Sequence, residues 1–176
     1  MNIARAQYRV SAQQGVTMRC LLVDKIIDWE NGKHITGIKN VTMSENFLQD
    51  HFPGFPVMPG VLQLETVLQL ASWLFFASTG YRKKAGLLSI KSIKFKKFVV
   101  PGDQMRVELN LKEFTETQAI FDAKIFVDSE LKTDIRRGTL SFVDVAAIED
   151  PVKARAHFDF ITGNAPMGGY GYSKNS

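Results

Sequence analysis

The sequence predicts an α+β protein in which one curved antiparallel sheet of roughly five to seven strands wraps around a single long, buried helix. Two observations predict this class. Residues 60–78 are apolar on nearly every side of a helix, and strand-like segments precede and follow them without another helix signal of comparable strength. A chain of 176 residues with 45% hydrophobic content also lies within the range of one domain with a substantial core.

The first strands are expected to form a hairpin. Residues 19–29 and 33–43 are rich in β-branched side chains and partly alternate between apolar and polar residues. Between them, Asn31-Gly32 is a strong signal for a two-residue hairpin turn. The domain is therefore expected to open with two antiparallel strands.

The helix is expected to run from about Gly60 to about Ser78. Pro59 precedes it, at a place where the missing N–H of proline is not needed. Gly80 can cap its C-terminal end, and Arg82 follows close to the negative end of the helix dipole. Because the helix is apolar on almost all sides, it should be buried in the domain rather than lie on its surface.

The remainder of the chain is interpreted mainly as strands. They are expected over residues 86–99, 105–114, 118–128 and 138–145, with a charged loop over residues 134–137 and a short terminal helix over residues 150–161. The organisation that follows is an N-terminal extension over residues 1–16, one domain over residues 17–161 and a flexible tail over residues 162–176, which is rich in Gly and Ser.

Composition excludes several classes of function. A net charge of +4 falls short of the clustered positive charge of a nucleic-acid binder, so no nucleic-acid partner is expected. One cysteine and three histidines, without a CxxC or HExxH pattern, argue against a protein-built metal site and favour a reducing cytoplasm. The N-terminus lacks the apolar run of a secretory signal, and Glu65 interrupts the best apolar segment, so neither export nor a membrane span is expected.

The stretch HFPGFPVMPGVLQLE at residues 51–65 carries the pattern of a reactive site. Its prolines and glycines form a rigid frame that can hold His51 in place before a reaction. Gly60 begins the helix, where unpaired N–H groups can bind the negative charge that develops on a carbonyl oxygen. Glu65 lies in the first turns of an apolar helix, where burial would raise its pKa and let it deliver a proton. Together these groups suggest proton abstraction next to a carbonyl.

Each of these residues also has an ordinary interpretation. A lone glutamate near a helix start is most often solvent-exposed or paired with a structural lysine, and a loop histidine is most often a surface residue. His34 and His157 are interpreted in that way. The proline frame is the reason to treat His51 differently.

The stretch resembles the signature of the (3R)-hydroxyacyl-acyl carrier protein dehydratases of bacterial fatty acid synthesis, a family with the hotdog fold. The segments LLVDKIIDWENGKHITGIKNVTMSENFLQDHFPG before it and IKFKKFVVPGDQMRVEL after it are similar to the family in order and spacing. The resemblance covers residues 21–145. It implies a lyase of lipid metabolism that reversibly dehydrates a (3R)-hydroxyacyl thioester to the trans-2-enoyl thioester. It also implies that no metal or redox cofactor is used, with the substrate carried on the phosphopantetheine of acyl carrier protein.

The same resemblance implies roles for individual residues. It implies that His51 is the catalytic histidine and Glu65 the catalytic acid. The Gly60 N–H would bind the thioester carbonyl, the Val57 carbonyl would orient the histidine ring, and Gln69 would support the carboxylate. The family also implies a homodimer with two composite sites, in which His51 of one subunit meets Glu65 of the other, and the assembly of three dimers into a hexamer.

Basic residues are expected to bring the carrier protein to this site. The carrier protein is strongly acidic, so Lys94, Lys96, Lys97 and Arg82 are candidates for its docking surface, with an ordinary solvated surface as the alternative. The sequence departs from the family pattern beside the histidine, where Asp50 replaces a customary glycine. Phe55 stands where the family commonly has a polar or basic residue.

Two other functions remain open. A hotdog thioesterase or an enoyl-CoA hydratase would use the same fold and a helix-borne carboxylate, but would not need the histidine and proline frame. A non-catalytic protein that binds acyl thioesters would be expected to lack either His51 or Glu65. The presence of both residues favours an enzyme.

Overall fold

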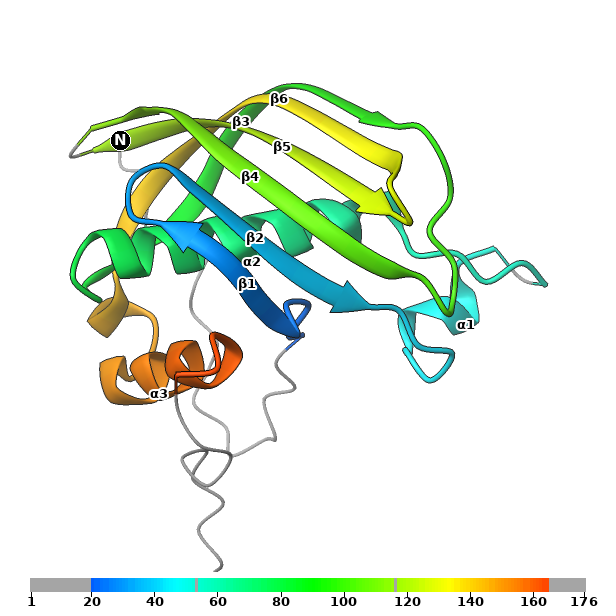
Figure 1. Cartoon of the computed structure of the whole chain (residues 1–176), viewed down its shortest axis with the longest axis horizontal. Coiled ribbons are helices and arrows are strands. Elements are labelled where there is room, and N and C mark those ends of the chain that lie inside the picture. The colour runs from blue at the N-terminus through cyan, green and yellow to red at the C-terminus, as the bar shows by residue number, and fades with distance from the viewer. Residues whose placement is uncertain (1–19, 53, 116, 165–176) are drawn as a thin grey trace, which may run out of the picture.

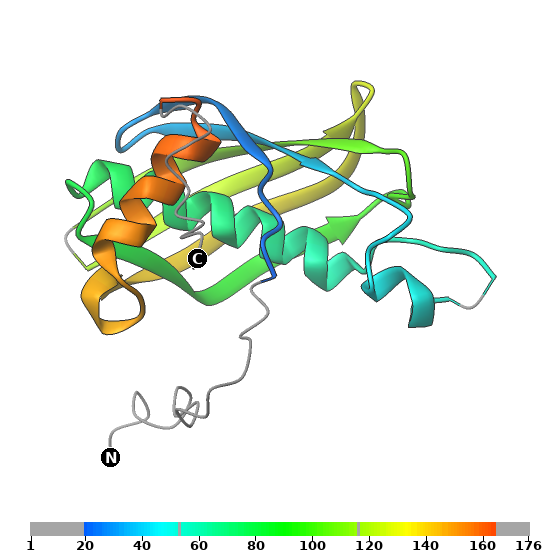
Figure 2. The same cartoon turned by 90° about the horizontal axis from the view of Figure 1, so that it is seen from below.

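The computed structural model describes residues 20–52, 54–115 and 117–164. They form one curved sheet that wraps around a long helix, with a second, shorter helix packed beside it (Figure 1, Figure 2). In chain order the elements are β1 (Lys25–Glu30), β2 (His34–Asn40), α1 (Phe47–Asp50), α2 (Gly60–Ser78), β3 (Lys83–Phe95), β4 (Gln104–Phe114), β5 (Gln118–Val127), β6 (Glu130–Asp144), the 3-10 helix η2 (Val145–Ala147) and α3 (Pro151–Ile161).

The sheet has six antiparallel strands in the order β1-β2-β4-β5-β6-β3. β3, the first strand after α2, joins the far edge of the sheet and, within the described part of the chain, pairs only with β6. β1 forms the opposite edge. The antiparallel sheet and the α+β class are therefore confirmed.

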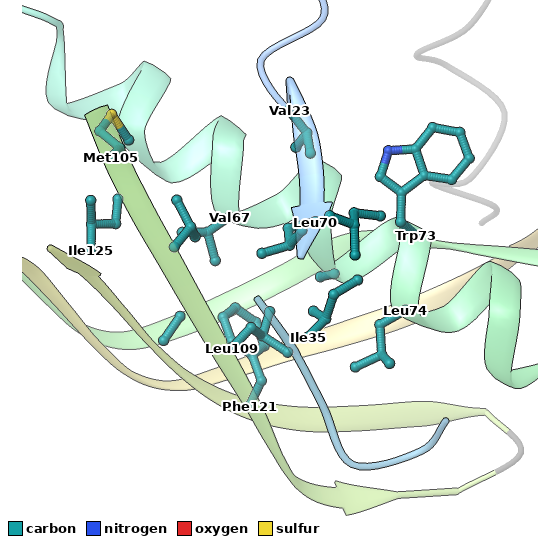
Figure 3. Packing of buried hydrophobic residues seen from close by; sticks show 14 of the residues in the cluster. Val23, Ile35, Val67, Leu70, Trp73, Leu74, Met105, Leu109, Phe121 and Ile125 are labelled. Carbon is teal, nitrogen blue, oxygen red and sulfur yellow. The ribbon is translucent and has the colours of Figure 1, made fainter. Parts of the chain in front are cut away.

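The helix α2 crosses the concave face of the sheet and supplies the centre of the core (Figure 3). Leu70 and Leu74 are fully buried, and they lie with Ile35 and Leu109 of the sheet. Burying each such side chain stabilises the fold by about 1.5–3 kcal/mol. Gly37 of β2 leaves room for this packing, because a Cβ atom there would lie 2.7 Å from Leu70 Cδ1.

The predicted bounds of the central helix, residues 60–78, are confirmed. The helix ends at the predicted cap, since Gly80 has a φ of 64° and the next N–H, that of Tyr81, returns to the Phe76 carbonyl at 2.7 Å. By length and composition alone, α2 could cross a membrane. In this fold it is the core helix, with 56% of its apolar window buried.

The charged loop predicted over residues 134–137 is wrong, because these residues lie inside β6. The turn between β5 and β6 is formed instead by Asp128 and Ser129, whose φ values are 47° and 69°. Positive φ at two successive residues gives a turn whose twist matches that of antiparallel strands. The charges misled the prediction because Asp134 and Arg136 pair with each other within the strand.

Two other boundaries differ from the prediction. The first hairpin is confirmed, but its loop has three residues rather than two, because Glu30 pairs with His34 across the turn. β3 runs over Lys83–Phe95 instead of residues 86–99. Residues after Phe95 leave the sheet and run toward the loop that carries His51. Three of them, residues 96–98, line the same pocket as His51.

The short terminal helix predicted over residues 150–161 is confirmed as α3. Asp150 caps it by accepting hydrogen bonds from the Val152 and Lys153 N–H groups. Phe158 packs its ring against Trp29 and Trp73, with centroid separations of 5.8 and 5.9 Å. Residues 1–19 and 165–176 lie outside the described part of the chain, so the predicted extension and tail stay predictions.

Candidate active site

The segment between α1 and α2 holds His51 in one orientation. Its Nδ1 atom lies 3.0 Å from the carbonyl oxygen of Val57. Because a carbonyl oxygen can only accept a hydrogen bond, Nδ1 carries the hydrogen, and in the neutral form of the ring the lone pair is on Nε2. His51 is therefore arranged to act as a base through Nε2.

Three further contacts fix the backbone around this histidine. The Met58 N–H donates to the Val99 carbonyl at 2.8 Å, and the buried Gln63 amide donates to the Met58 carbonyl at 3.4 Å. Gln63 also accepts a hydrogen bond of 2.6 Å from Thr133 Oγ1, which ties the loop to β6. The loop is thus held by the segment after β3, by β6 and by α2, as preorganisation of a reactive group requires.

Gly60 lies at the start of α2, where the first N–H groups of a helix have no partner in a preceding turn. Pro59 occupies the N-cap position and supplies no capping side chain. A side chain at Gly60 would collide with Phe95, since a Cβ atom there would lie 2.8 Å from Cζ of the ring. The helix end therefore stays bare and can offer an N–H to a carbonyl oxygen.

His51, Val57 and Gly60 line a single pocket of about 630 Å³. The other residues in its wall are Phe52, Met58, Gln63, Phe95, Lys96, Lys97, Phe98 and Lys132. This volume suits a small-molecule site, and the wall combines apolar with basic side chains. Three of the five residues predicted for catalysis and substrate binding therefore meet in one place.

Glu65 and Gln69 lie on another face of α2. Glu65 is half-buried, does not line this pocket, and accepts a hydrogen bond of 3.0 Å from Gln69 Nε2. Gln69 also donates to the Cys20 carbonyl and accepts from the Leu22 N–H, each at 2.8 Å. The carboxylate is thus linked through Gln69 to the segment before β1, outside the pocket of its own chain.

The four residues predicted for docking do not form one surface. Lys96 and Lys97 line the pocket, and Lys94 lies close to them on β3. Arg82 precedes β3 at its opposite end, where it lines a second hollow of about 500 Å³. A strand of this length separates its ends by roughly 40 Å, so Arg82 is not part of the surface around His51.

Lys132 and Gln63 also belong to the pocket. Gln63 lies one helical turn after Gly60 on α2, a spacing that could have indicated it, whereas no sequence pattern indicated Lys132. Lys132 is brought there because β3 crosses to the far edge of the sheet, where the Lys96 N–H bonds the Lys132 carbonyl at 2.7 Å. Glu130 forms ion pairs with both Lys132 and Lys97. Hydrogen bonds from Lys132 and then Lys97 hold the pKa of Glu130 below its ordinary value.

The remaining candidates lie away from the pocket wall or outside the described atoms. His34 pairs with Asp28 at 2.9 Å and keeps a partly exposed side chain. The surface position expected for His157 is wrong, because this residue is buried and packs edge-on against Trp73. The side chain of Asp50 lies outside the described part of the structure. Among the described residues, no group of three or more His, Cys, Asp and Glu side chains is placed to hold a metal ion.

The six-stranded antiparallel sheet around one buried helix defines the hotdog class of fold. A Streptococcus mutans protein bound to acetyl-CoA shares this fold with a TM-score of 0.56 and 16% identity, over 75% of this chain and 98% of that chain. A thioesterase from Haemophilus influenzae aligns with a TM-score of 0.52 and 15% identity, over 70% of this chain and 79% of that chain. At such low identities the likeness shows the fold alone.

Residues 16–136 match the FabA-like domain, and the chain belongs to this family. It is 39% identical over 115 residues to the 3-hydroxyacyl-[acyl-carrier-protein] dehydratase FabZ of Desulforamulus reducens. That alignment covers 65% of this chain and 81% of the relative. The dehydratase FabZ of Geotalea uraniireducens is 41% identical over 119 residues, with the same coverage of both chains. The family match ends within β6, so α3 lies beyond it.

Proposed function

We propose that the protein catalyses the reversible dehydration of a (3R)-hydroxyacyl thioester to the trans-2-enoyl thioester on acyl carrier protein, in fatty acid synthesis. The observation that carries the proposal is the hydrogen bond from His51 to the Val57 carbonyl, which fixes a base in the pocket where α2 begins at Gly60. The similarity to FabZ dehydratases supports the choice of substrate.

In the proposed reaction, the thioester carbonyl accepts a hydrogen bond from the Gly60 N–H, which makes the proton on C2 more acidic. His51 Nε2 takes that proton, the electron pair forms the C2–C3 double bond, and the C3–O bond breaks. Protonated Glu65 gives its proton to the departing hydroxyl, so one water leaves. Solvent then returns both groups to their starting states, and neither a metal nor a redox cofactor enters the balance.

We propose further that each site is shared by two subunits. Within one chain, Glu65 does not line the pocket that contains His51. On one side of the long edge strand β3, no described residue pairs with it, and Leu87 and Leu88 are exposed on this strand. A second β3 added there would continue the sheet and bring a second α2 toward the first pocket. Three such dimers would form the hexamer that the resemblance implies.

The proposed partner is the acidic carrier protein, docking on the pocket side of the molecule. Lys94, Lys96 and Lys97 support this placement because they lie at or beside the pocket wall. The proposed location is the cytoplasm, which suits a chain whose only cysteine, Cys20, is free and exposed. A membrane span is not part of the proposal, because α2 serves as the core helix.

Removing either titratable group should remove turnover. We expect His51→Ala and Glu65→Gln each to lower kcat by about 10²–10⁴-fold, the usual contribution of a general acid or base. The assay follows enoyl absorbance with crotonyl- and 3-hydroxybutyryl-thioesters, each carried on acyl carrier protein and on coenzyme A. His34→Ala and Glu113→Gln are matched controls away from the pocket and should turn over like wild type.

Several results would contradict this proposal. Wild-type protein that converts neither thioester would contradict the dehydratase activity. Variants at His51 and Glu65 that keep wild-type rates would contradict the roles proposed for these residues. Turnover of the coenzyme A thioesters alone would point to an enoyl-CoA hydratase. Release of a free thiol would point to a thioesterase, and thioester binding without turnover would point to a non-catalytic protein.

A further inference from the structure

Two exposed phenylalanines touch each other at the mouth of the pocket. Phe55 is 53% exposed and Phe98 is 61% exposed, yet their ring centroids lie only 5.6 Å apart in an edge-to-face arrangement. Phe98 belongs to the pocket wall that also contains His51. Exposed aromatic rings gathered in one place mark a contact surface, because leaving them in water gives up burial energy.

The aromatic pair is fixed relative to the reactive histidine. The Phe55 N–H donates to the Phe52 carbonyl at 2.9 Å, which closes a tight turn directly after His51. Phe98 is followed by Val99, whose carbonyl accepts from the His51 loop. A pair of rings held by the same frame as the base loses little entropy on binding, so it can serve as an anchor.

Positive charge surrounds this apolar centre. Lys94 and Lys96 are exposed and form no ion pair with any residue that the structure describes. Lys97 and Lys132, in contrast, share Glu130. The patch therefore offers two rings beside two uncompensated cations, a combination that complements an acidic surface with an apolar spot.

We propose that Phe55 and Phe98 form the apolar anchor of the docking surface for the acidic carrier protein, with Lys94 and Lys96 as its charged rim; this inference rests on the proposed function. A second copy of this chain is a poorer occupant. A two-fold contact centred on the patch would bring the free lysines of both copies together, and like charges oppose such contacts.

The test compares one acyl group on two carriers. For Phe55→Ser and Phe98→Ser, we expect the KM for 3-hydroxybutyryl-carrier protein, divided by the KM for the coenzyme A thioester, to rise about tenfold. The rise should persist at high salt, because the lost contact is apolar. Lys96→Glu should raise the same ratio only at low ionic strength. The control is Val152→Ser on α3, where the side chain is 77% exposed and away from the pocket wall.

Three outcomes would overturn the inference. An equal rise in both KM values would place the rings in acyl binding rather than carrier docking. A change in oligomeric mass for Phe55→Ser would make the patch a subunit contact. Unchanged carrier kinetics together with lost binding to anionic phospholipid vesicles would make it a lipid contact. If wild type turns over neither thioester, the proposed function fails separately, and carrier binding to each variant, measured by fluorescence anisotropy, still tests the anchor.

Discussion

At His51, one backbone carbonyl determines which nitrogen of the ring donates a hydrogen bond and which can accept one. The Val57 oxygen keeps the hydrogen on Nδ1 and turns Nε2 into the acceptor. A histidine free to rotate would present each nitrogen in turn and would have to be ordered during every turnover. In the proposed reaction, the rigid loop would therefore spare the entropy cost of ordering the ring at each turnover, because that cost is already included in folding.

Glu130 controls how much positive charge the pocket mouth carries. Lys132 and Lys97 lower its pKa, so these ion pairs are fully formed above the ordinary carboxyl pKa and are lost as the pH falls through the lowered value. At neutral pH, Glu130→Gln should release both lysines. We expect the KM for carrier-bound substrate to fall about two- to threefold at low ionic strength and to be unchanged at high salt.

The measurement is KM as a function of salt for carrier-bound substrate, with Glu113→Gln as the control at an exposed position on β4. A lower KM that survives in high salt would show that Glu130 acts through local structure instead of charge.

Local constraints decide which site residues could be predicted. His51, Val57 and Gly60 lie within one short stretch, so the prolines and glycines between them restrict their geometry directly. Gln63 lies one helical turn after Gly60, so its place could have been found from helical spacing. Lys132 reaches the pocket through strand order, which residue spacing does not encode. Strand order also explains the place of Arg82, because β3 separates it from Lys94 by most of the length of a strand.

At the scale of elements, α3 packs into the hydrophobic core and does not lie loosely on the surface. Its Phe158 is 1% exposed and meets two tryptophans, one from β1 and one from α2. Arg155 of α3 lies 3.6 Å from the centroid of the Tyr81 ring, a cation–π contact that joins α3 to the segment after α2. A segment beyond the family match therefore packs over the C-terminal half of α2.

This attachment predicts a large stability cost for one ring. We expect Phe158→Ala to lower the free energy of unfolding by about 3–5 kcal/mol, the range for removing a buried aromatic side chain. Phe160→Ala, on the same helix but 40% exposed, should cost clearly less. Urea unfolding of both variants tests this, and equal small losses would mean that α3 is only loosely held.

Element identity was more predictable than element ends. The bounds of α2 follow from an apolar run closed by Pro59 and Gly80, two residues whose backbone preferences are strong. β6 was cut short in the prediction because a charged strand segment looks like a loop when its partners are unknown. In the fold, Asp122 on the adjacent strand accepts from the Arg137 N–H at 2.8 Å, so the charges support the strand.

At the scale of the whole molecule, the proposed composite site makes a prediction that single variants cannot test. His51→Ala and Glu65→Gln are each expected to be inactive alone. In a dimer that contains one of each, one site combines both defects and the other retains both intact residues. Co-expressed in equal amounts, the two variants should therefore recover about a quarter of wild-type activity.

The activity of the purified mixture is compared with each variant alone, at the same total protein concentration. A mixture as inactive as its components, with subunit exchange verified by mass spectrometry, would place both groups within one chain.

The two edges of the sheet differ in a way that bears on self-association. β1 is short, contains a bulge between Ile26 and Asp28, and has Trp29 packed against α3. β3 is long, and one of its sides has no partner strand among the described residues. Strand addition therefore has a single competent edge per molecule. Once two such edges meet, strand addition stops at a pair and does not continue into a fibre, so assembly of dimers into a hexamer would have to use other surfaces.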